Sequence, residues 1–338
     1  MLDGVYELNK KFILGIDGGG TYTRVAITDT DGNLASYVQW HGGAFLLKDA
    51  KANENVLSAI CEAIKKADCE LSDIGGITAG IAGYDTENDL KWVRELTNIQ
   101  GLACTPQHVN DAVIAHKGAL LSNPGIIAIS GTGSVIFGIT EPGRHVRNYD
   151  FHHYSFSKAC YLSYNSVYAI IAGETDQTDI DFMTVVFKHF AVKDLAALVQ
   201  LGSEGFIEEY SQRDQLFGSL APAVTQAALN GSHLAERVCM RTAEDIVTGV
   251  EMVGACFESE SVMVALIGSV ANSTVIKSAI NELLSRKCNK KYVLAEHPLP
   301  PVLGAIMMTL EQIKIIIDKQ VIENLFRSAE AIALSPDR

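Results

Sequence analysis

An aspartate followed by three glycines is the first stretch of this chain that could do chemistry: Asp17-Gly18-Gly19-Gly20-Thr21, with Thr23 two residues later. Glycine has no Cβ, so the backbone N–H groups of such a turn can approach a ligand closely. A carboxylate and hydroxyls beside the turn suit a metal ion and phosphate oxygens. A glycine-rich hairpin without a ligand is the alternative. We expect Asp17 to hold the metal and the following residues to bind phosphate: Gly18, Gly19, Gly20, Thr21 and Thr23.

A second stretch repeats this pattern between residues 130 and 134, where the chain reads Ser130-Gly131-Thr132-Gly133-Ser134. Apolar, β-branched segments flank it at 126–129 and 135–139, as they flank the first turn at 12–16 and 22–28. The repetition favours phosphate binding at both turns. In the second turn the expected phosphate-binding residues are Gly131, Thr132, Gly133 and Ser134.

Asp111 lies between a short expected strand at 107–110 and an expected helix at 112–121. Open α/β sheets bind ligands at the carboxyl ends of their strands, so a carboxylate here is well placed for chemistry. It could accept the proton of an attacking hydroxyl group. Capping of the following helix is the structural alternative for the same side chain.

Composition restricts the possible partners. The chain has 338 residues, 48% hydrophobic residues and a net charge of −13, without a basic run longer than a pair. This argues against nucleic acid as a partner. No apolar stretch approaches the roughly 20 residues that span a bilayer, so we expect no membrane partner. Seven scattered cysteines without a CxxC pair predict reduced, buried thiols in a cytoplasmic protein.

The order of expected elements is βββαβαβ up to Asp111, and a similar order begins again afterwards. The second half carries a mainly helical insertion at about 155–257. Such a duplication predicts two similar α/β domains with a cleft between them. The expected boundaries are 1–112 and 113–338, with the last helix packing back on the N-terminal domain.

The motifs together resemble the N-acetylglucosamine kinase branch of the BadF/BadG/BcrA/BcrD ATPases, in the actin, hexokinase and heat-shock chaperone ATPase superfamily. The matching segments span nearly the whole chain: 15–23, 80–83, 110–112, 129–134, 268–272 and 301–305. The resemblance implies a duplicated ribonuclease H-like (actin-like ATPase) fold of two βββαβαβα domains around a central cleft. It also implies a homodimer.

The resemblance further implies ATP-dependent phosphorylation of an amino sugar, N-acetylglucosamine or a related muramic sugar, with Mg²⁺. Asp111 would then be the general base. The nucleotide base and ribose would lie against Gly268, Ser269 and Asn272. The implied sugar-binding residues are Gly83, Asn110, Asp111 and Thr132.

The segment 149–166 departs from the family pattern. Its Gly-rich sugar segment and Asp-Glu pair are missing, and no glycine occurs between Gly143 and Gly173. The loop at 43–46 also lacks the usual asparagine. A kinase with another acceptor and a non-catalytic nucleotide-binding sensor therefore stay open, and an activator ATPase of a radical dehydratase is disfavoured by the unpaired cysteines. Five aromatic residues of the segment could stack on a ligand or pack internally: Phe151, Tyr154, Phe156, Tyr161 and Tyr164.

Overall fold

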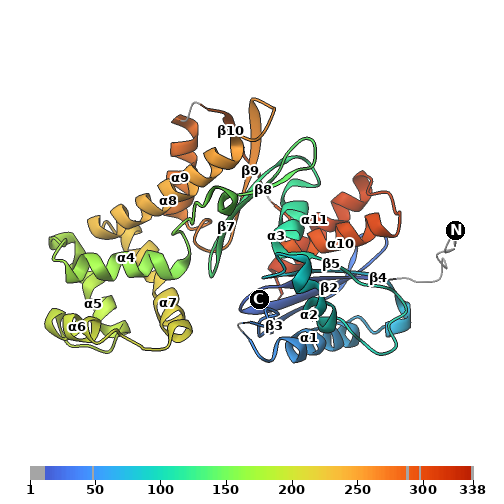
Figure 1. The fold of residues 1–338 in the computed structure, drawn as a ribbon, viewed down its shortest axis with the longest axis horizontal. Helices are drawn as coiled ribbons and strands as arrows, with labels where there is room; N and C mark the ends of the chain where they lie inside the picture. Colours follow the sequence, from blue (N-terminus) through green and yellow to red (C-terminus); the bar gives the residue numbers. More distant parts are fainter. Residues whose placement is uncertain (1–11, 48, 287–288, 297, 336–338) are drawn as a thin grey trace. The chain divides into compact units, whose positions relative to one another are not determined.

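The computed structural model describes residues 12–47, 49–286, 289–296 and 298–335. The chain divides into two compact units (Figure 1). The first comprises Met1–Asn123 and Glu296–Arg338, and the second comprises Pro124–Ala295. The first unit thus extends beyond the expected boundary at 112, and it includes residues 296–338, of which the last helix is expected to pack on this domain.

The first unit is built on a five-stranded sheet in the order β3-β2-β1-β4-β5. β1, β2 and β3 are antiparallel, whereas β4 and β5 run parallel to β1. The strands are β1 (Phe12–Gly18), β2 (Tyr22–Asp29), β3 (Leu34–His41), β4 (Ile74–Ile81) and β5 (Gln107–Asn110). β1 is buried along almost its whole length because helices cover both faces of the sheet.

Side-chain alternation along β1 assigns its two faces. Leu14 and Ile16 pack with α1, whereas Ile13 packs with α10 and α11. The helices of this unit are α1 (Ala52–Lys66), α2 (Leu90–Leu96), α3 (Asp111–Leu120), α10 (Pro301–Gln312) and α11 (Lys319–Ala333), with short 3₁₀ turns η1 (Leu71–Asp73) and η2 (Glu87–Asp89). α11 donates two side-chain hydrogen bonds to the β2–β3 turn, from Asn324 and Ser328.

Helix α10 approaches α3 and the sheet unusually closely. A Cβ on Gly304 would lie 1.9 Å from the carbonyl oxygen of Ile114 in α3, and one on Gly15 would lie 2.6 Å from that of Val302. The contact includes a buried hydrogen bond from Thr309 Oγ1 to Thr78 Oγ1 (2.9 Å). α3 belongs to the first unit for this reason, and its start is held at a defined place beside β1.

The second unit has a sheet of the same topology, in the order β10-β9-β6-β7-β8. β6 pairs antiparallel with β7 and parallel with β9. Its strands are β6 (Gly125–Ser130), β7 (Ser134–Ile139), β8 (His145–Arg147), β9 (Ser261–Ile267) and β10 (Lys291–Leu294). The duplicated α/β fold expected from the sequence is therefore confirmed, with α10 packing in the first unit.

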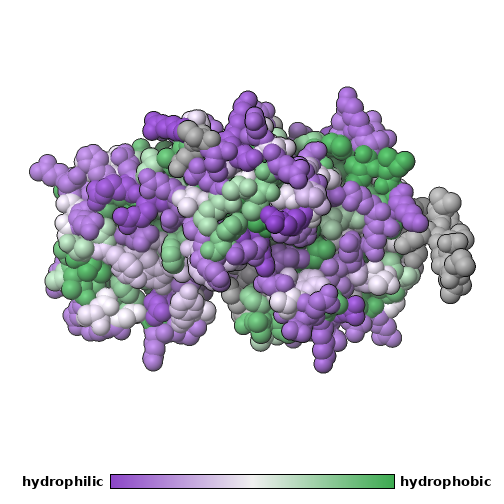
Figure 2. Space-filling view, turned by 45° about the horizontal axis from the view of Figure 1, so that its top comes forward, coloured by the Kyte–Doolittle hydropathy of each residue, from purple (hydrophilic) through white to green (hydrophobic). Residues whose placement is uncertain are grey.

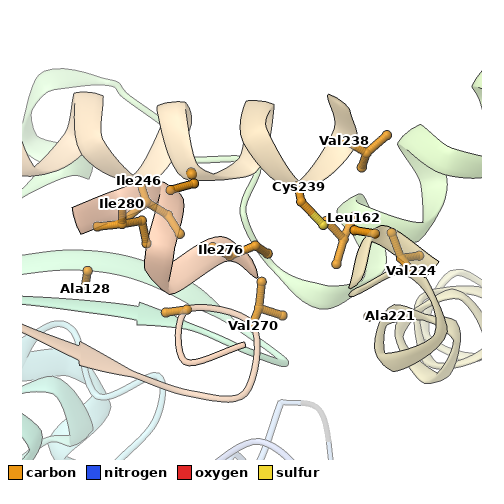
Figure 3. Packing of buried hydrophobic residues seen from close by; sticks show 14 of the residues in the cluster. Ala128, Leu162, Ala221, Val224, Val238, Cys239, Ile246, Val270, Ile276 and Ile280 are labelled. Carbon is orange, nitrogen blue, oxygen red and sulfur yellow. The ribbon is translucent and has the colours of Figure 1, made fainter. Parts of the chain in front are cut away.

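Helices of the second unit form its largest core. They are α4 (Ala159–Ile171), α5 (Ile180–His189), α6 (Leu195–Ser203), α7 (Tyr210–Leu229), α8 (His233–Gly254) and α9 (Thr274–Arg286), with 3₁₀ turns η3 (Asn148–Phe151) and η4 (Gln177–Asp179). Figure 3 shows side chains of α4, α7, α8 and α9 meeting in this core, among them Leu162, Val224, Cys239 and Ile276. The expected helical insertion is present between β8 and β9.

The cysteines only partly match the expectation of buried thiols. Cys160 and Cys239 are buried, but Cys61 is exposed on α1. It lies on the solvent side of an amphipathic helix, where a scattered cysteine needs no core contact. Cys288 lies outside the described residues.

The face of the molecule seen in Figure 2 is mainly hydrophilic, with smaller hydrophobic areas between the polar side chains. This agrees with a chain that carries a net charge of −13. None of the described helices combines the length and the apolar character needed to cross a membrane.

Gly304→Ala is expected to lower the free energy of unfolding by about 2–3 kcal/mol, because its methyl group would overlap the backbone of α3 and force the two helices apart. Urea unfolding followed by circular dichroism measures this change.

The matched control is Gly218→Ala in α7, where the nearest atom to a new Cβ is 4.0 Å away. That substitution should raise stability by about 0.5–1 kcal/mol. Equal effects of the two substitutions would contradict the close contact between α10 and α3.

Candidate active site

The first glycine turn joins β1 to β2 and is fixed by main-chain hydrogen bonds. The N–H of Gly19 donates to the carbonyl of Tyr22 (3.0 Å), and the carbonyl of Gly19 accepts from the N–H of Ala44 (2.9 Å). Gly20 is exposed, and no atom lies within 4 Å of the place a Cβ would occupy. The turn is therefore well supported while its tip borders open space.

Thr23 does not occupy the position expected for a phosphate ligand. Its side chain is fully buried, and its Oγ1 donates a hydrogen bond to the carbonyl of Gly42 (2.9 Å). Alternation along β2 directs Thr23 to the face that α1 covers. The prediction that Thr23 binds phosphate is corrected on this ground: its hydroxyl links β2 to the chain after β3.

Asp17 lies near the end of β1, buried and opposite Arg24 of β2. Arg24 Nη1 is 3.1 Å from Asp17 Oδ2, and Arg24 Nε donates to Gln39 Oε1 of β3 (2.8 Å). Burial raises the pKa of Asp17, and the guanidinium of Arg24 offsets only part of that effect. A row of polar side chains across three neighbouring strands thus fixes this carboxyl group beside the glycine turn.

Asp111 is the first residue of α3, directly after β5. Asn110 is the N-cap, since its side-chain oxygen accepts from the N–H of Ala112 (2.9 Å). Asp111 Oδ1 accepts from the same N–H (3.0 Å). Burial raises the pKa of Asp111 to about 7, and the carboxylates of Asp17 and Asp85 add to the rise. A carboxyl group with this pKa can take up or release a proton near neutral pH.

The loop after β4 lies beside Asn110. The side-chain amide of Asn110 donates to the carbonyl of Tyr84 (3.1 Å), which links this loop to the start of α3. Gly83 has a φ of +79°, and a Cβ there would overlap the ring of Phe45. Phe45 in turn stacks on Trp92 (6.1 Å between centroids). The first unit therefore brings together Gly83, Asn110 and Asp111, which stay predictions as sugar-binding residues.

The second glycine turn lies between β6 and β7 of the second unit. The N–H of Gly131 donates to the carbonyl of Gly133 (2.9 Å), and the side chain of Ser134 donates to the carbonyl of Ser155 (2.8 Å). Thr132 and Gly133 are exposed at the tip. Their predicted role in binding phosphate requires this exposure.

The loop after β9 packs directly against the second turn. The carbonyl of Ser130 accepts from the N–H groups of Val270 (3.1 Å) and Ala271 (3.2 Å). Gly268 has a φ of +93°, and a Cβ there would lie 2.3 Å from that same carbonyl oxygen. Ser269 and Asn272 are exposed on the loop. The second unit therefore brings its glycine turn together with the residues predicted for the nucleotide base and ribose.

Comparison with known proteins identifies the family. A model of the BadF/BadG/BcrA/BcrD ATPase family matches residues 14–308 of the chain. The chain belongs to this family. The predicted resemblance to it, and to N-acetylglucosamine kinases, is thus confirmed.

Two curated relatives cover most of this BadF/BadG/BcrA/BcrD family member. The N-acetylmuramic acid/N-acetylglucosamine kinase of Clostridium acetobutylicum is 26% identical over 281 residues, 78% of this chain and 86% of the relative. The N-acetyl-D-glucosamine kinase of Dictyostelium discoideum is 24% identical over 331 residues, 91% of this chain and 100% of the relative.

Solved structures share the fold of this family member. A Chromobacterium violaceum protein solved as a candidate N-acetylglucosamine kinase aligns with a TM-score of 0.68 at 20% identity, covering 89% of this chain and 99% of the other. A ROK family glucokinase of Streptomyces griseus, in complex with glucose and AMPPNP, aligns with a TM-score of 0.58 at 16% identity over 89% of this chain and 99% of its own.

The segment that departs from the pattern of the BadF/BadG/BcrA/BcrD family supports the second glycine turn. Its Ser155 and Ser157 are buried, and their carbonyls accept from Ser134 and Ser130 of the turn. The N–H of Ala159 donates to the carbonyl of Gly131 (2.7 Å). Serines and main-chain groups here fix the turn without any glycine in the segment.

The aromatic residues of this segment differ in their burial. Tyr164 is buried and stacks on Phe217, with 3.9 Å between ring centroids. Tyr154 and Phe156 are 59% and 55% exposed. Internal packing therefore accounts for Tyr164 and leaves other rings at the surface.

Sequence reasoning missed Arg24 and Asp85, whose charges act on the two site aspartates, and Gln39, which accepts a hydrogen bond from Arg24. The signal for Arg24 was present: a tight turn after β1 places a charged residue of β2 directly opposite Asp17. Asp85 has no comparable sequence signal, because its effect on Asp111 arises from the approach of two separate loops.

Asp111→Asn is expected to raise the free energy of unfolding above that of the wild type at pH 8 and to change it little near pH 4. Folding raises the pKa of Asp111 from 3.8 to about 7. Between those values the folded state keeps a proton that the unfolded state loses, so stability falls as the pH rises. The neutral amide removes this loss, a gain of roughly 2–4 kcal/mol at pH 8. Urea unfolding at a series of pH values measures it.

Asn110→Ala provides the neighbouring control. It removes the N-cap and should cost about 1 kcal/mol at every pH. A stability difference between Asp111→Asn and the wild type that is the same at pH 4 and pH 8 would show that Asp111 has an ordinary pKa.

Proposed function

We propose that this protein is an ATP-dependent kinase that phosphorylates an amino sugar, N-acetylglucosamine or a related muramic sugar. The observation that carries the proposal is Asp111, a half-buried carboxyl group at the start of α3 with a pKa of about 7. It belongs to a member of an ATPase family whose curated relatives are named as kinases of these sugars.

In this proposal Asp111 is the general base. A sugar hydroxyl that attacks the terminal phosphate of ATP must lose its proton, and the carboxylate of Asp111 accepts it as the new O–P bond forms. The cap at Asn110 keeps Asp111 in the first turn of α3. A carboxyl group with a pKa near the working pH is ionised in about half of the molecules and is a stronger base than an ordinary carboxylate, which suits this role.

The residues present are compatible with Mg²⁺ and ATP. Asp17 supplies a buried carboxylate beside a turn whose Gly20 leaves open space. The described residues contain no cluster of three or more His, Cys, Asp or Glu side chains that could hold a metal ion. Mg²⁺ keeps several water ligands and needs only one or two carboxylates, so Asp17 would hold it mainly through water. When bound, Mg²⁺ neutralises charge on the transferring phosphate.

The residues of each turn are the proposed phosphate-binding residues. In the first unit these are Gly18, Gly19, Gly20 and Thr21, and in the second Gly131, Thr132, Gly133 and Ser134. Because the N–H groups of Gly19 and Gly131 donate within their own turns, the donors to phosphate oxygens would be main-chain N–H groups of the other turn residues. Gly268, Ser269 and Asn272 would contact the nucleotide base and ribose, while Gly83, Asn110 and Thr132 would contact the sugar. A homodimer and a cytoplasmic location stay predictions.

A nucleotide-binding sensor is the second candidate. It is favoured by the segment 149–166, where the family's sugar segment is replaced by residues whose carbonyls support the second glycine turn. The two candidates differ in turnover: a sensor binds nucleotide and does not phosphorylate any sugar.

Asp111→Asn is expected to lower kcat for sugar-dependent ADP release by about 10²–10⁴-fold, because an amide cannot accept the proton. Nucleotide affinity, measured by calorimetry with ATP and Mg²⁺, should stay close to the wild-type value.

Asp181→Asn, at an exposed position of α5 in the second unit, is the control and should keep wild-type kcat. Activity that survives in Asp111→Asn would remove Asp111 as the base. Tight ATP binding by the wild type without turnover of N-acetylglucosamine or N-acetylmuramic acid would favour the sensor instead.

A further inference from the structure

A pocket of about 450 Å³ lies within the second unit, between α4, the end of α6 and the first turns of α7. These helices pack against one another at one end of the unit (Figure 1). The volume falls in the range of small-molecule sites. None of the residues that line the pocket belongs to the phosphate, nucleotide or sugar residues of the proposed kinase site.

The wall of the pocket is mainly aromatic. Tyr161, Tyr164 and Tyr168 come from one face of α4, and Tyr210 comes from the first turn of α7. Tyr164 is buried against Phe217, which fixes the inner part of the wall. Tyr168 and Tyr210 are 53% and 59% exposed, so their ring faces are accessible from solvent.

Two charged side chains line the same pocket, and both are held in place. Asp214 accepts from the Tyr164 hydroxyl (3.2 Å) and from Lys158 Nζ (3.1 Å). Arg213 Nη1 donates to the carbonyl of Ile207 (2.8 Å), and its guanidinium lies 5.6 Å from the centroid of the Tyr210 ring. A guanidinium has five N–H donors and a carboxylate about four acceptor sites. Each side chain therefore keeps hydrogen-bonding capacity for a ligand.

We propose that this pocket binds a saccharide. A pyranose ring presents a face of C–H bonds, which packs on the electron-rich face of an aromatic ring. Its hydroxyl groups both donate and accept, so one ligand can satisfy Asp214 as acceptor and Arg213 as donor. A purely apolar ligand would remove both charged groups from water without new partners, at a cost in binding free energy.

The pocket is a site additional to the second glycine turn. α4 begins at Ala159, whose N–H contacts Gly131 of the turn. At about 1.5 Å per residue, Tyr168 lies about 13 Å farther along the helix axis. The pocket therefore begins at Tyr161, two residues after Ala159, and extends from there along α4 away from the turn.

The test is a ligand-observed nuclear magnetic resonance titration of the full-length protein, without nucleotide, with N-acetylglucosamine and its β-1,4-linked disaccharide. Tyr168→Ala and Tyr210→Ala should each weaken binding of the disaccharide by about tenfold, the effect of losing the packing of one ring. Both rings are exposed, so neither variant should unfold the protein.

Tyr154→Ala is the matched control, because Tyr154 is also 59% exposed and lies outside the pocket. It should leave the affinity for the disaccharide unchanged. Two results would overturn the proposal. The first is wild-type affinity for both sugars in Tyr168→Ala and Tyr210→Ala. The second is a changed sedimentation coefficient in these variants with unchanged sugar binding, because that result would make the pocket a contact between subunits. Loss of kinase activity in Asp111→Asn bears on neither outcome.

Discussion

The close packing of α10 against α3 and the central strands is the constraint on which the first unit depends. Glycines at 15, 118 and 304 let backbone meet backbone there, so no side chain separates the layers. This packing places the first turn of α3 at the same edge of the sheet as the end of β1. Asp111 and Asp17 therefore lie close enough for one carboxylate to affect the pKa of the other.

Asp17 is buried and Asp111 is half-buried, and two carboxyl groups so near one another carry an electrostatic cost that the guanidinium of Arg24 offsets in part. Arg24 contacts Asp17 directly, so Asp17 is the better compensated of the two. Asp111 accepts main-chain hydrogen bonds, among them one from the N–H of Ala112, but burial together with Asp17 and Asp85 raises its pKa. The difference in partners separates their chemistry: one carboxylate is suited to a cation and the other to a proton.

The sequence predicted most strands because their signals are local. The apolar run 12–16, the glycine turn and the β-branched run 22–28 specify a hairpin without any distant contact. Both glycine turns lie between paired strands as predicted, while the roles of Asp17 and Asp111 stay predictions. The prediction failed for Thr23, whose side chain is directed inward by strand alternation and by the cover of α1. The expected boundary at 112 also separates α3 and α10 from the first unit, because their membership of that unit depends on a contact between residues 114 and 304.

Both units of the duplicated fold hold a glycine turn in place with main-chain hydrogen bonds, whatever side chains surround it. Such contacts survive almost any change of side chain outside the turns. In the second unit, Ser155, Ser157 and Ala159 supply those contacts from a segment without glycine. The same helix then presents tyrosines along one face toward α7. A segment that supports a turn through its backbone can carry different side chains, and a ligand contact can be built from them without disturbing the turn.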